Sequence, residues 1–293
     1  MFAANTMWGF MSPVSKFVFL GSAVTPFILA DCRMAGAAAL FWIASLFTKR
    51  EKVSRRDMLL LFIASLLGIV FNQGLFTFGL GLTSPVNASI ITTSTPILTM
   101  LIAAAYLKEP VTGKKVGGIV LGAGGALLLI LSGRQASPTQ GGNVAGDVLC
   151  VLAEVSFSLY LVLFKALISR YSPVTLMKWM FLFASLCTLP FTYKSLVSLE
   201  WSSLDLMVDL GIAFVVCGGT FLCYLLSPVG QHYLRPTVVS MYCYVQPIIA
   251  SVVAVWWGMD SFTLLKVVAV VLIFSGVFLV TVSKSRAQME AEQ

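Results

Sequence analysis

Charged residues are scarce in this sequence. Asp, Glu, Lys and Arg together make up 11% of the 293 residues, whereas soluble domains carry about 25%. None of these four residue types occurs between Asp57 and Lys108. Because one bilayer-spanning helix needs about 20 apolar residues, this stretch is predicted to hold two spanning helices and an uncharged turn. With 58% of its residues hydrophobic, the chain is predicted to be an integral membrane protein.

Residues that build metal centres and nucleophilic active sites are also few. The sequence has one histidine, His232, which we expect in a short loop, and its six cysteines form no CxxC pair. Scattered cysteines in apolar segments are typical of small hydrophobic packing residues. No GxxxxGK[ST] motif is present, so ATP hydrolysis on this chain is excluded as a driving force. We therefore expect no cofactor and no metal, and a membrane-embedded enzyme is the less favoured alternative.

The apolar runs and the interruptions between them predict an all-α membrane protein of ten transmembrane helices. The expected spans are 2–20, 26–47, 58–79, 84–107, 115–132, 147–168, 174–193, 206–226, 236–257 and 263–283. The net charge is +7, but the basic residues lie mostly between these runs. They are therefore interpreted as topology signals, and no nucleic-acid partner is expected.

The distribution of Lys and Arg predicts the orientation. Five basic residues fall between the second and third spans, whereas the outer loops hold little beyond Arg134 and Lys194. This bias predicts a multi-pass protein of the plasma (inner) membrane with both termini cytoplasmic. Its expected partners are the lipid bilayer and a small-molecule solute, and the sequence leaves the oligomeric state open.

The two halves of the chain resemble each other. When the segment 85–128 is shifted by 151 positions, twelve residues are identical, including Pro96 with Pro247 and Gly125 with Gly276. The first spans match at a shift of 149, where Trp8 meets Phe157. Paired prolines, the acidic pair Glu109 and Asp260, and aligned lysines are harder to obtain by chance than apolar identities. The sequence therefore predicts an internal duplication.

Each half has an odd number of predicted helices, five, so the halves enter the membrane from opposite sides. Inverted repeats of this kind recur in secondary transporters, with the solute site between the halves. We predict a first five-helix repeat over 1–132, an extracytoplasmic linker over 133–145, a second repeat over 146–284 and a cytoplasmic tail over 285–293.

Several short motifs along the chain point to one family. They are Trp8-Gly9 followed by Lys16, Arg33, Asn72-Gln73, the run from Gly81 to Ile90 with Pro96 after it, Glu109-Pro110, and Gly146-Asp147. With them the sequence resembles the drug/metabolite transporter superfamily, specifically its EamA-type members of two five-helix units. Asn72-Gln73 is similar to the plant nodulin-type branch, whose members move amino acids and related metabolites. The second half departs from the family pattern at Gln246-Pro247 and Asp260. These departures weaken any assignment of the family's substrates to this chain.

Polar and aromatic side chains within the spans are the candidate solute-binding residues. Large amides and phenols need hydrogen-bond partners in a membrane, which favours a cavity over lipid. Shorter hydroxyl side chains serve equally well to join helices. The candidates are Trp8, Asn72, Gln73, Thr92, Thr93, Tyr160, Tyr244 and Gln246. Pro96 and Pro247 are expected to kink the fourth and ninth spans and to act as hinges or solute-facing breaks.

Charged residues inside spans are costly and often functional. Glu154 lies about seven residues inside the sixth span and is the candidate for a proton-coupling group. The alternative is that Glu154 pairs with a buried Lys or a hydroxyl. Arg33 and Asp31 are two positions apart and so lie on different helix faces. Arg33 is interpreted as a structural anchor.

These features predict a secondary transporter, an exporter or facilitator of small organic metabolites such as amino acids. It would work by alternating access around a cavity in the middle of the membrane. A membrane channel is the alternative, which a saturable flux capable of counter-flow would distinguish from a carrier.

Overall fold

The computed structural model describes residues 1–82, 91–132, 144–199, 201, 204–256 and 264–283. Helices account for the regular structure throughout, and none of the described residues forms a strand. In the first half these helices are α1 (Phe2–Gly21), α2 (Pro26–Ala44), α3 (Arg55–Ser65), η1 (Leu66–Phe71), α4 (Asn72–Leu82), α6 (Thr95–Tyr106) and α7 (Gly113–Ser132). The second half has α8 (Val144–Leu163), α9 (Lys165–Ile168), α10 (Pro173–Val197), α11 (Leu206–Val216), η3 (Cys217–Leu222), α12 (Cys223–Tyr233), α13 (Pro236–Met241), η4 (Tyr242–Tyr244), α14 (Val245–Trp256) and α15 (Leu264–Thr281).

Five helical stretches in the described part of the chain are long and apolar enough to cross a bilayer. They are Phe27–Ala44, Arg55–Gly79, Val144–Leu163, Pro173–Lys194 and Leu206–Tyr233. Thr95–Tyr106 and Val267–Thr281 are shorter apolar helices. The expectation of a helical multi-pass membrane protein is therefore confirmed, and the number of ten spans stays a prediction.

One helix end differs from the sequence-based expectation. The eighth span was expected to end at residue 226, with His232 in the following loop, but helix α12 continues to Tyr233 and holds His232 in its last turn. The Lys165 ammonium group explains the extension, because it donates hydrogen bonds to the backbone carbonyls of Gln231, His232 and Leu234. A cation satisfies and complements the free carbonyls at a helix C-terminus.

Two spans contain a π-helical segment in their middle. Leu66–Phe71 separates α3 from α4, and Cys217–Leu222 separates α11 from α12. The bounds of these two helix–π–helix units correspond residue for residue at the shift of 151. In the second unit the Thr220 hydroxyl donates to the carbonyl of Val215, five residues earlier. Because π segments redirect side chains and are frequent at functional sites, these two segments are natural places to search for one.

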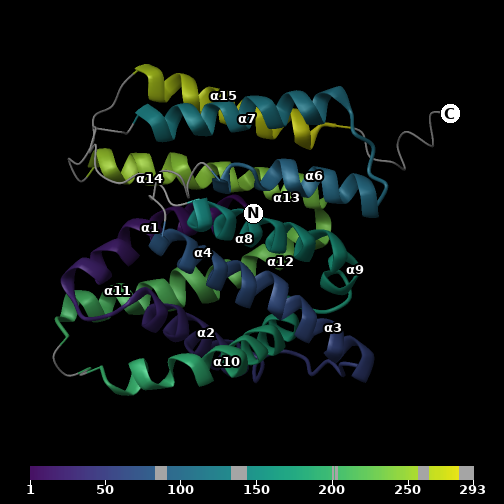
Figure 1. The fold of residues 1–293 in the computed structure, drawn as a ribbon. Helices are drawn as coiled ribbons and strands as arrows, with labels where there is room; N and C mark the ends of the chain where they lie inside the picture. Colours follow the sequence, from purple (N-terminus) through teal and green to yellow (C-terminus); the bar gives the residue numbers. More distant parts are fainter. Residues whose placement is uncertain (83–90, 133–143, 200, 202–203, 257–263, 284–293) are drawn as a thin grey trace.

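The helices pack in matched pairs. Helices α7 and α15 lie side by side at one edge of the molecule, and α2 and α10 lie together at the opposite edge (Figure 1). Glycines set the first contact: a Cβ built on Gly118 would lie 2.7 Å from the Gly276 carbonyl oxygen, and one on Gly125 would lie 2.7 Å from the Ala269 carbonyl oxygen. Since residue 118 meets 276 and residue 125 meets 269, α7 and α15 run antiparallel. Small residues allow this close approach of two helix backbones.

Two of the helical runs are broken, not bent. A turn at Thr93 and Ser94 precedes α6, and the 3₁₀ segment η4 precedes α14. Pro96 and Pro247 fall in the first turn after these breaks. A proline has no N–H to donate to the carbonyl four residues earlier, and the Thr92 carbonyl, four residues before Pro96, accepts from the Thr95 hydroxyl instead. The role of Pro96 and Pro247 as hinges stays a prediction.

Candidate functional site

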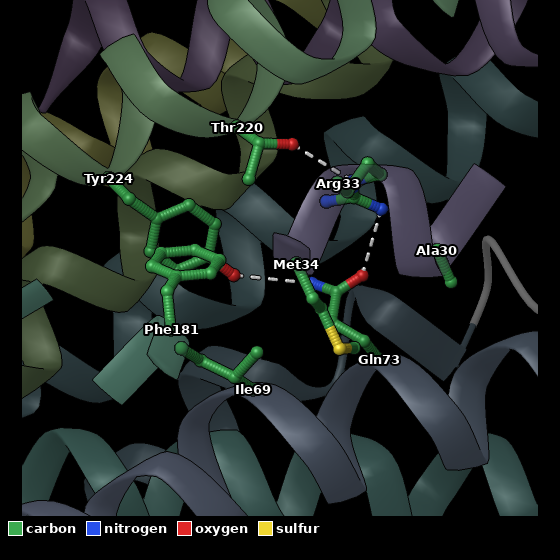
Figure 2. A pocket seen from close by; sticks show the side chains of 8 residues that line it. All are labelled: Ala30, Arg33, Met34, Ile69, Gln73, Phe181, Thr220 and Tyr224. Atoms are coloured by element: carbon green, nitrogen blue, oxygen red, sulfur yellow. Dashed lines mark hydrogen bonds between the residues drawn. The ribbon is translucent and has the colours of Figure 1, made fainter. Parts of the chain in front are cut away.

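The π segments and their neighbours enclose an internal cavity. Its lining residues come from six elements: Ala30, Arg33 and Met34 of α2, Ile69 of η1, Gln73 of α4, Phe181 of α10, Thr220 of η3 and Tyr224 of α12 (Figure 2). Its free space holds little more than a water molecule, far less than the roughly 300–1,000 Å³ typical of ligand sites. Both halves of the chain thus contribute to one narrow cavity.

A single arginine supplies the positive charge of this cavity. The Nε of Arg33 donates to the Thr220 hydroxyl at 2.9 Å, and its Nη1 donates to Gln73 Oε1 at 3.1 Å. The residues that the structure describes place no carboxylate within ion-pair distance of Arg33, whose neighbour Asp31 is not its partner. The guanidinium is therefore held by two neutral oxygen atoms, one from each half of the chain.

The amide of Gln73 is fixed by what surrounds it. Arg33 can only donate, so Gln73 must turn its oxygen toward the guanidinium. Its nitrogen then donates to the Tyr224 hydroxyl at 3.2 Å and to the Asn72 side-chain oxygen at 3.4 Å. Asn72 in turn donates to the backbone carbonyl of Ala153 at 3.1 Å. This chain of hydrogen bonds runs from the cavity to α8.

Aromatic rings form one wall of the cavity. The Tyr224 ring meets Phe181 edge-on, with centroids 4.9 Å apart, and meets Trp8 edge-on at 5.6 Å. Figure 2 shows Tyr224 and Phe181 together on the side of the cavity opposite Arg33 and Gln73. Tyr160 is buried in the same core cluster, but its hydroxyl donates to Gln231 and not toward Arg33. The cavity thus combines one cationic side with one aromatic side.

A second polar cluster is buried between α6 and α8. The Glu154 carboxyl group is only 5% exposed, and its Oε2 lies 2.5 Å from the Thr95 hydroxyl oxygen. The same hydroxyl lies 2.6 Å from the Thr92 carbonyl oxygen. One turn further along, the Thr99 hydroxyl donates to the Ser158 hydroxyl at 3.0 Å. Glu154 therefore has the hydroxyl partner that its alternative interpretation anticipated, and it is turned inward.

The remaining candidates lie at two further contacts. The Tyr244 hydroxyl is buried and donates to the Thr93 carbonyl at 3.1 Å, which satisfies the backbone at the break before α6. Gln246 donates from its side-chain nitrogen to Asn5 of α1 at 2.9 Å. Neither Tyr244 nor Gln246 lines the cavity of Arg33.

The structure thus divides the sequence-predicted site. Trp8, Asn72 and Gln73 come together around the cavity, and Tyr160 adjoins them in the same core. Thr92, Thr93, Glu154 and Tyr244 gather at the break before α6, whereas Gln246 joins α14 to α1. Besides the apolar Ala30, Met34 and Ile69, the cavity residues that the sequence did not single out as binding residues are Arg33, Phe181, Thr220 and Tyr224. A charge within an apolar span was the available signal for Arg33.

These observations define a class of protein: a multi-pass helical membrane protein with a polar, partly aromatic cavity in its interior. The chain belongs to the EamA-like transporter family, whose model matches residues 1–131 and again residues 144–282. It is a membrane transporter of the drug/metabolite type, as members of this family are transporters and not enzymes.

Similar proteins come from distant organisms. The uncharacterized transporter YyaM of Bacillus subtilis (strain 168) is 26% identical over 255 residues, which cover 86% of this chain and 83% of the relative. The WAT1-related protein At5g13670 of Arabidopsis thaliana is 23% identical over 316 residues, covering 96% and 82%. A crystal structure matches with a TM-score of 0.79 and 17% identity over 100% of this chain and 97% of that chain, which shows a shared fold.

Proposed function

We propose that this protein is a secondary transporter of small organic solutes that works by alternating access around the cavity between its halves. The observation that carries the proposal is the cavity itself. Its lining joins Arg33 and Gln73 of the first half to Thr220 and Tyr224 of the second half through direct hydrogen bonds. Buried polar groups in a membrane protein face a partner or a solute path. The free space holds little more than a water molecule, so the described conformation is proposed to be a closed state that widens to admit a solute.

We further propose that the halves are inverted repeats, 1–132 and 146–284, joined by 133–145 and followed by a tail, 285–293. The antiparallel packing of α7 with α15, which are equivalent at the shift of 151, supports this relation. Two hydrogen bonds also join residues 151 positions apart: Gln73 with Tyr224, and Tyr244 with Thr93. Equivalent residues of two repeats contact each other only near the two-fold axis between them.

The breaks before α6 and α14 are proposed as the hinges of the rocking motion. Each break directly precedes a longer helix that has Pro96 or Pro247 in its first turn. The Tyr244–Thr93 hydrogen bond links one break to the other. Hinge motions are absorbed by a few residues at the ends of helices.

Glu154 is proposed as the proton carrier of this transporter. The Thr95 hydroxyl has one proton and lies within hydrogen-bond distance of both the Thr92 carbonyl and Glu154 Oε2. One proton cannot serve both acceptors, whereas a protonated Glu154 donates to Thr95 and leaves the Thr95 proton for Thr92. When Glu154 loses its proton, the Thr95 hydroxyl must turn toward it. The contact thus differs between the two protonation states.

We propose the plasma (inner) membrane as the location, with both termini cytoplasmic. The loop between α2 and α3 carries Lys49, Arg50 and Lys52, and Arg55 and Arg56 follow in the first turn of α3. Basic loops remain on the cytoplasmic side of a bilayer.

Counter-flow in proteoliposomes tests the transport function. Liposomes containing the purified protein are loaded with millimolar unlabelled phenylalanine, leucine or benzoate, and entry of the same labelled compound is followed over time. A carrier gives a transient accumulation above equilibrium that depends on the internal load. Ion currents without any accumulation, for every compound of a wider metabolite panel, would make the protein a channel and reject the carrier mechanism.

The role of Glu154 has its own test. We expect Glu154→Gln to abolish the stimulation of uptake by an inward proton gradient and to retain counter-flow exchange. Glu51→Gln is the matched control, because Glu51 is exposed in the loop before α3. Gradient dependence that is unchanged in Glu154→Gln would rule out Glu154 as the carrier.

A further inference from the structure

Arg33 forms no ion pair with any residue that the structure describes. Its guanidinium is bonded to the neutral oxygens of Thr220 and Gln73, and the described part of the chain brings no carboxylate to it. Removing a cation from water is costly unless a counter-charge is supplied. Among the acidic residues of the spans, Glu154 contacts Thr95. Asp31, two positions from Arg33, forms no ion pair with it, and its buried oxygen Oδ2 has no hydrogen-bond partner in the described structure. The cavity thus has one positive charge that can pair with a bound anion.

Arg33 also has hydrogen-bond donors left for a bound anion. A guanidinium has five N–H groups in a planar fork, and the two bonds above use one on Nε and one on Nη1. Three N–H groups remain. Figure 2 shows the guanidinium at the edge of the cavity between Thr220 and Gln73, with Tyr224 facing it from across the space. A planar fork of this kind matches a carboxylate in a bidentate arrangement.

The charge balance selects among anions. Arg33 is the one charged side chain among the residues that line the described cavity. A single cation balances a monocarboxylate and leaves a doubly charged phosphate ester with an excess negative charge. An ammonium group would find only neutral acceptors, because no acidic residue lines this space. The Tyr224 and Phe181 rings on the other side suit an apolar or aromatic group.

We propose that Arg33 binds the carboxylate group of the transported solute, and that the substrate class is small monocarboxylates carrying an aromatic or branched apolar group. This inference rests on the proposed transport function and assigns its specificity. Gln73 and Thr220 are positioning residues, because they hold the guanidinium at the cavity from the two halves. Gln73 reaches Tyr224 as well, so the anion-binding and aromatic sides are set by one network.

The test compares ligands that differ only at the charged end. The probes are 3-phenylpropanoate, its neutral amide and 3-phenylpropan-1-amine, with 4-methylpentanoate and its amide as an aliphatic pair and inorganic phosphate as a second anion. Binding is measured by the shift in the melting midpoint of the purified protein, and transport by counter-flow. In the wild-type protein we expect the carboxylates to bind about 10-fold to 100-fold more tightly than their amides, the usual range for a charge-assisted hydrogen bond.

Substitutions then assign the effect to Arg33. We expect Arg33→Gln to remove the preference for carboxylates and Arg33→Lys to keep a weaker preference, because lysine retains the charge but not the fork. Arg56→Gln is the matched control, since Arg56 is exposed in the first turn of α3. The comparison of ligand classes in the wild-type protein stands even if Arg33→Gln does not fold.

Each result decides the proposal. It is overturned if amides, the amine or phosphate bind as tightly as the carboxylates, if no carboxylate shifts the melting midpoint, or if Arg33→Gln keeps the preference. Failure of the proposed function has a different signature: no solute of any charge gives counter-flow. Counter-flow of amines or neutral compounds with no role for Arg33 would leave the transporter intact and reject only this specificity.

Discussion

The contact between α7 and α15 gives a sharp stability prediction, because adjacent glycines on α7 differ in their surroundings. A Cβ added to Gly118 would lie 2.7 Å from the Gly276 carbonyl oxygen, and one added to Gly125 would lie 2.7 Å from the Ala269 carbonyl oxygen. These are backbone atoms that cannot turn aside. For Gly117 and Gly124, no atom lies within 4 Å of the added Cβ.

We expect Gly118→Ala and Gly125→Ala to destabilise the protein by about 1–3 kcal/mol each, the usual cost of overpacking. This corresponds to a fall in the apparent melting midpoint of roughly 2–10 °C. Gly117→Ala and Gly124→Ala should be neutral or stabilising, by up to about 1 kcal/mol, because alanine is the better helix former. Gly276→Ala should resemble Gly125→Ala, since its Cβ would lie 2.5 Å from the Gly118 carbonyl oxygen.

The assay is thermal unfolding of the detergent-purified variants, followed by intrinsic fluorescence, with size-exclusion profiles to verify folding. Comparing the two variants of each adjacent pair cancels effects that arise from the position in the helix or from the detergent. Equal effects of Gly117→Ala and Gly118→Ala would refute the packing of α7 against α15 described above.

Two further predictions concern the loops between spans. Lys165→Met should lower the melting midpoint and speed amide hydrogen exchange at the end of α12, because the three carbonyls that Lys165 binds lose their partner. Lys194→Met, at an exposed position, is the control. Unchanged hydrogen exchange in Lys165→Met would disprove the capping role of Lys165. Partial burial raises the pKa of Glu51, but hydrogen bonds from Thr175 and Ser172 outweigh it, so the pKa lies below the usual 4.5. The stabilisation by Glu51 should therefore be present above about pH 4.5 and be lost as the pH falls through the folded-state pKa. The difference in melting midpoint between wild type and Glu51→Gln should vanish in acid, and a difference that grows there would contradict the contact.

Much of the helical framework could be predicted from the sequence, because charge-free runs in a membrane protein have few structural options. The second candidate span, Arg55–Gly79, lies largely within the uncharged stretch after Asp57, as expected. Gln73 lines the cavity, and Asn72 beside it donates to the Ala153 carbonyl of α8. In each case the residue type restricts the surroundings that its side chain can have, so one segment alone predicts whether it faces lipid, water or a polar partner.

What the sequence could not provide are partners from distant segments. Arg33 meets Gln73 and Thr220, which are 40 and 187 positions away, and no local pattern predicts such pairs. The π segments at Leu66–Phe71 and Cys217–Leu222 have no propensity signature of their own. Gln246 was expected at the cavity because it is polar, yet the buried Asn5 on α1 satisfies it instead. Polarity shows that a side chain needs a partner but not which partner it has.

The two proposals, for Arg33 and for Glu154, are physically connected. Hydrogen bonds run from Arg33 through Gln73 and Asn72 to the carbonyl of Ala153, the residue before Glu154. If a monocarboxylate binds at Arg33 while Glu154 holds a proton, the loaded protein gains no net charge relative to its empty, deprotonated form. Moving one elementary charge against 100 mV costs about 2.3 kcal/mol. A carrier that takes up the anion and the proton together avoids this barrier.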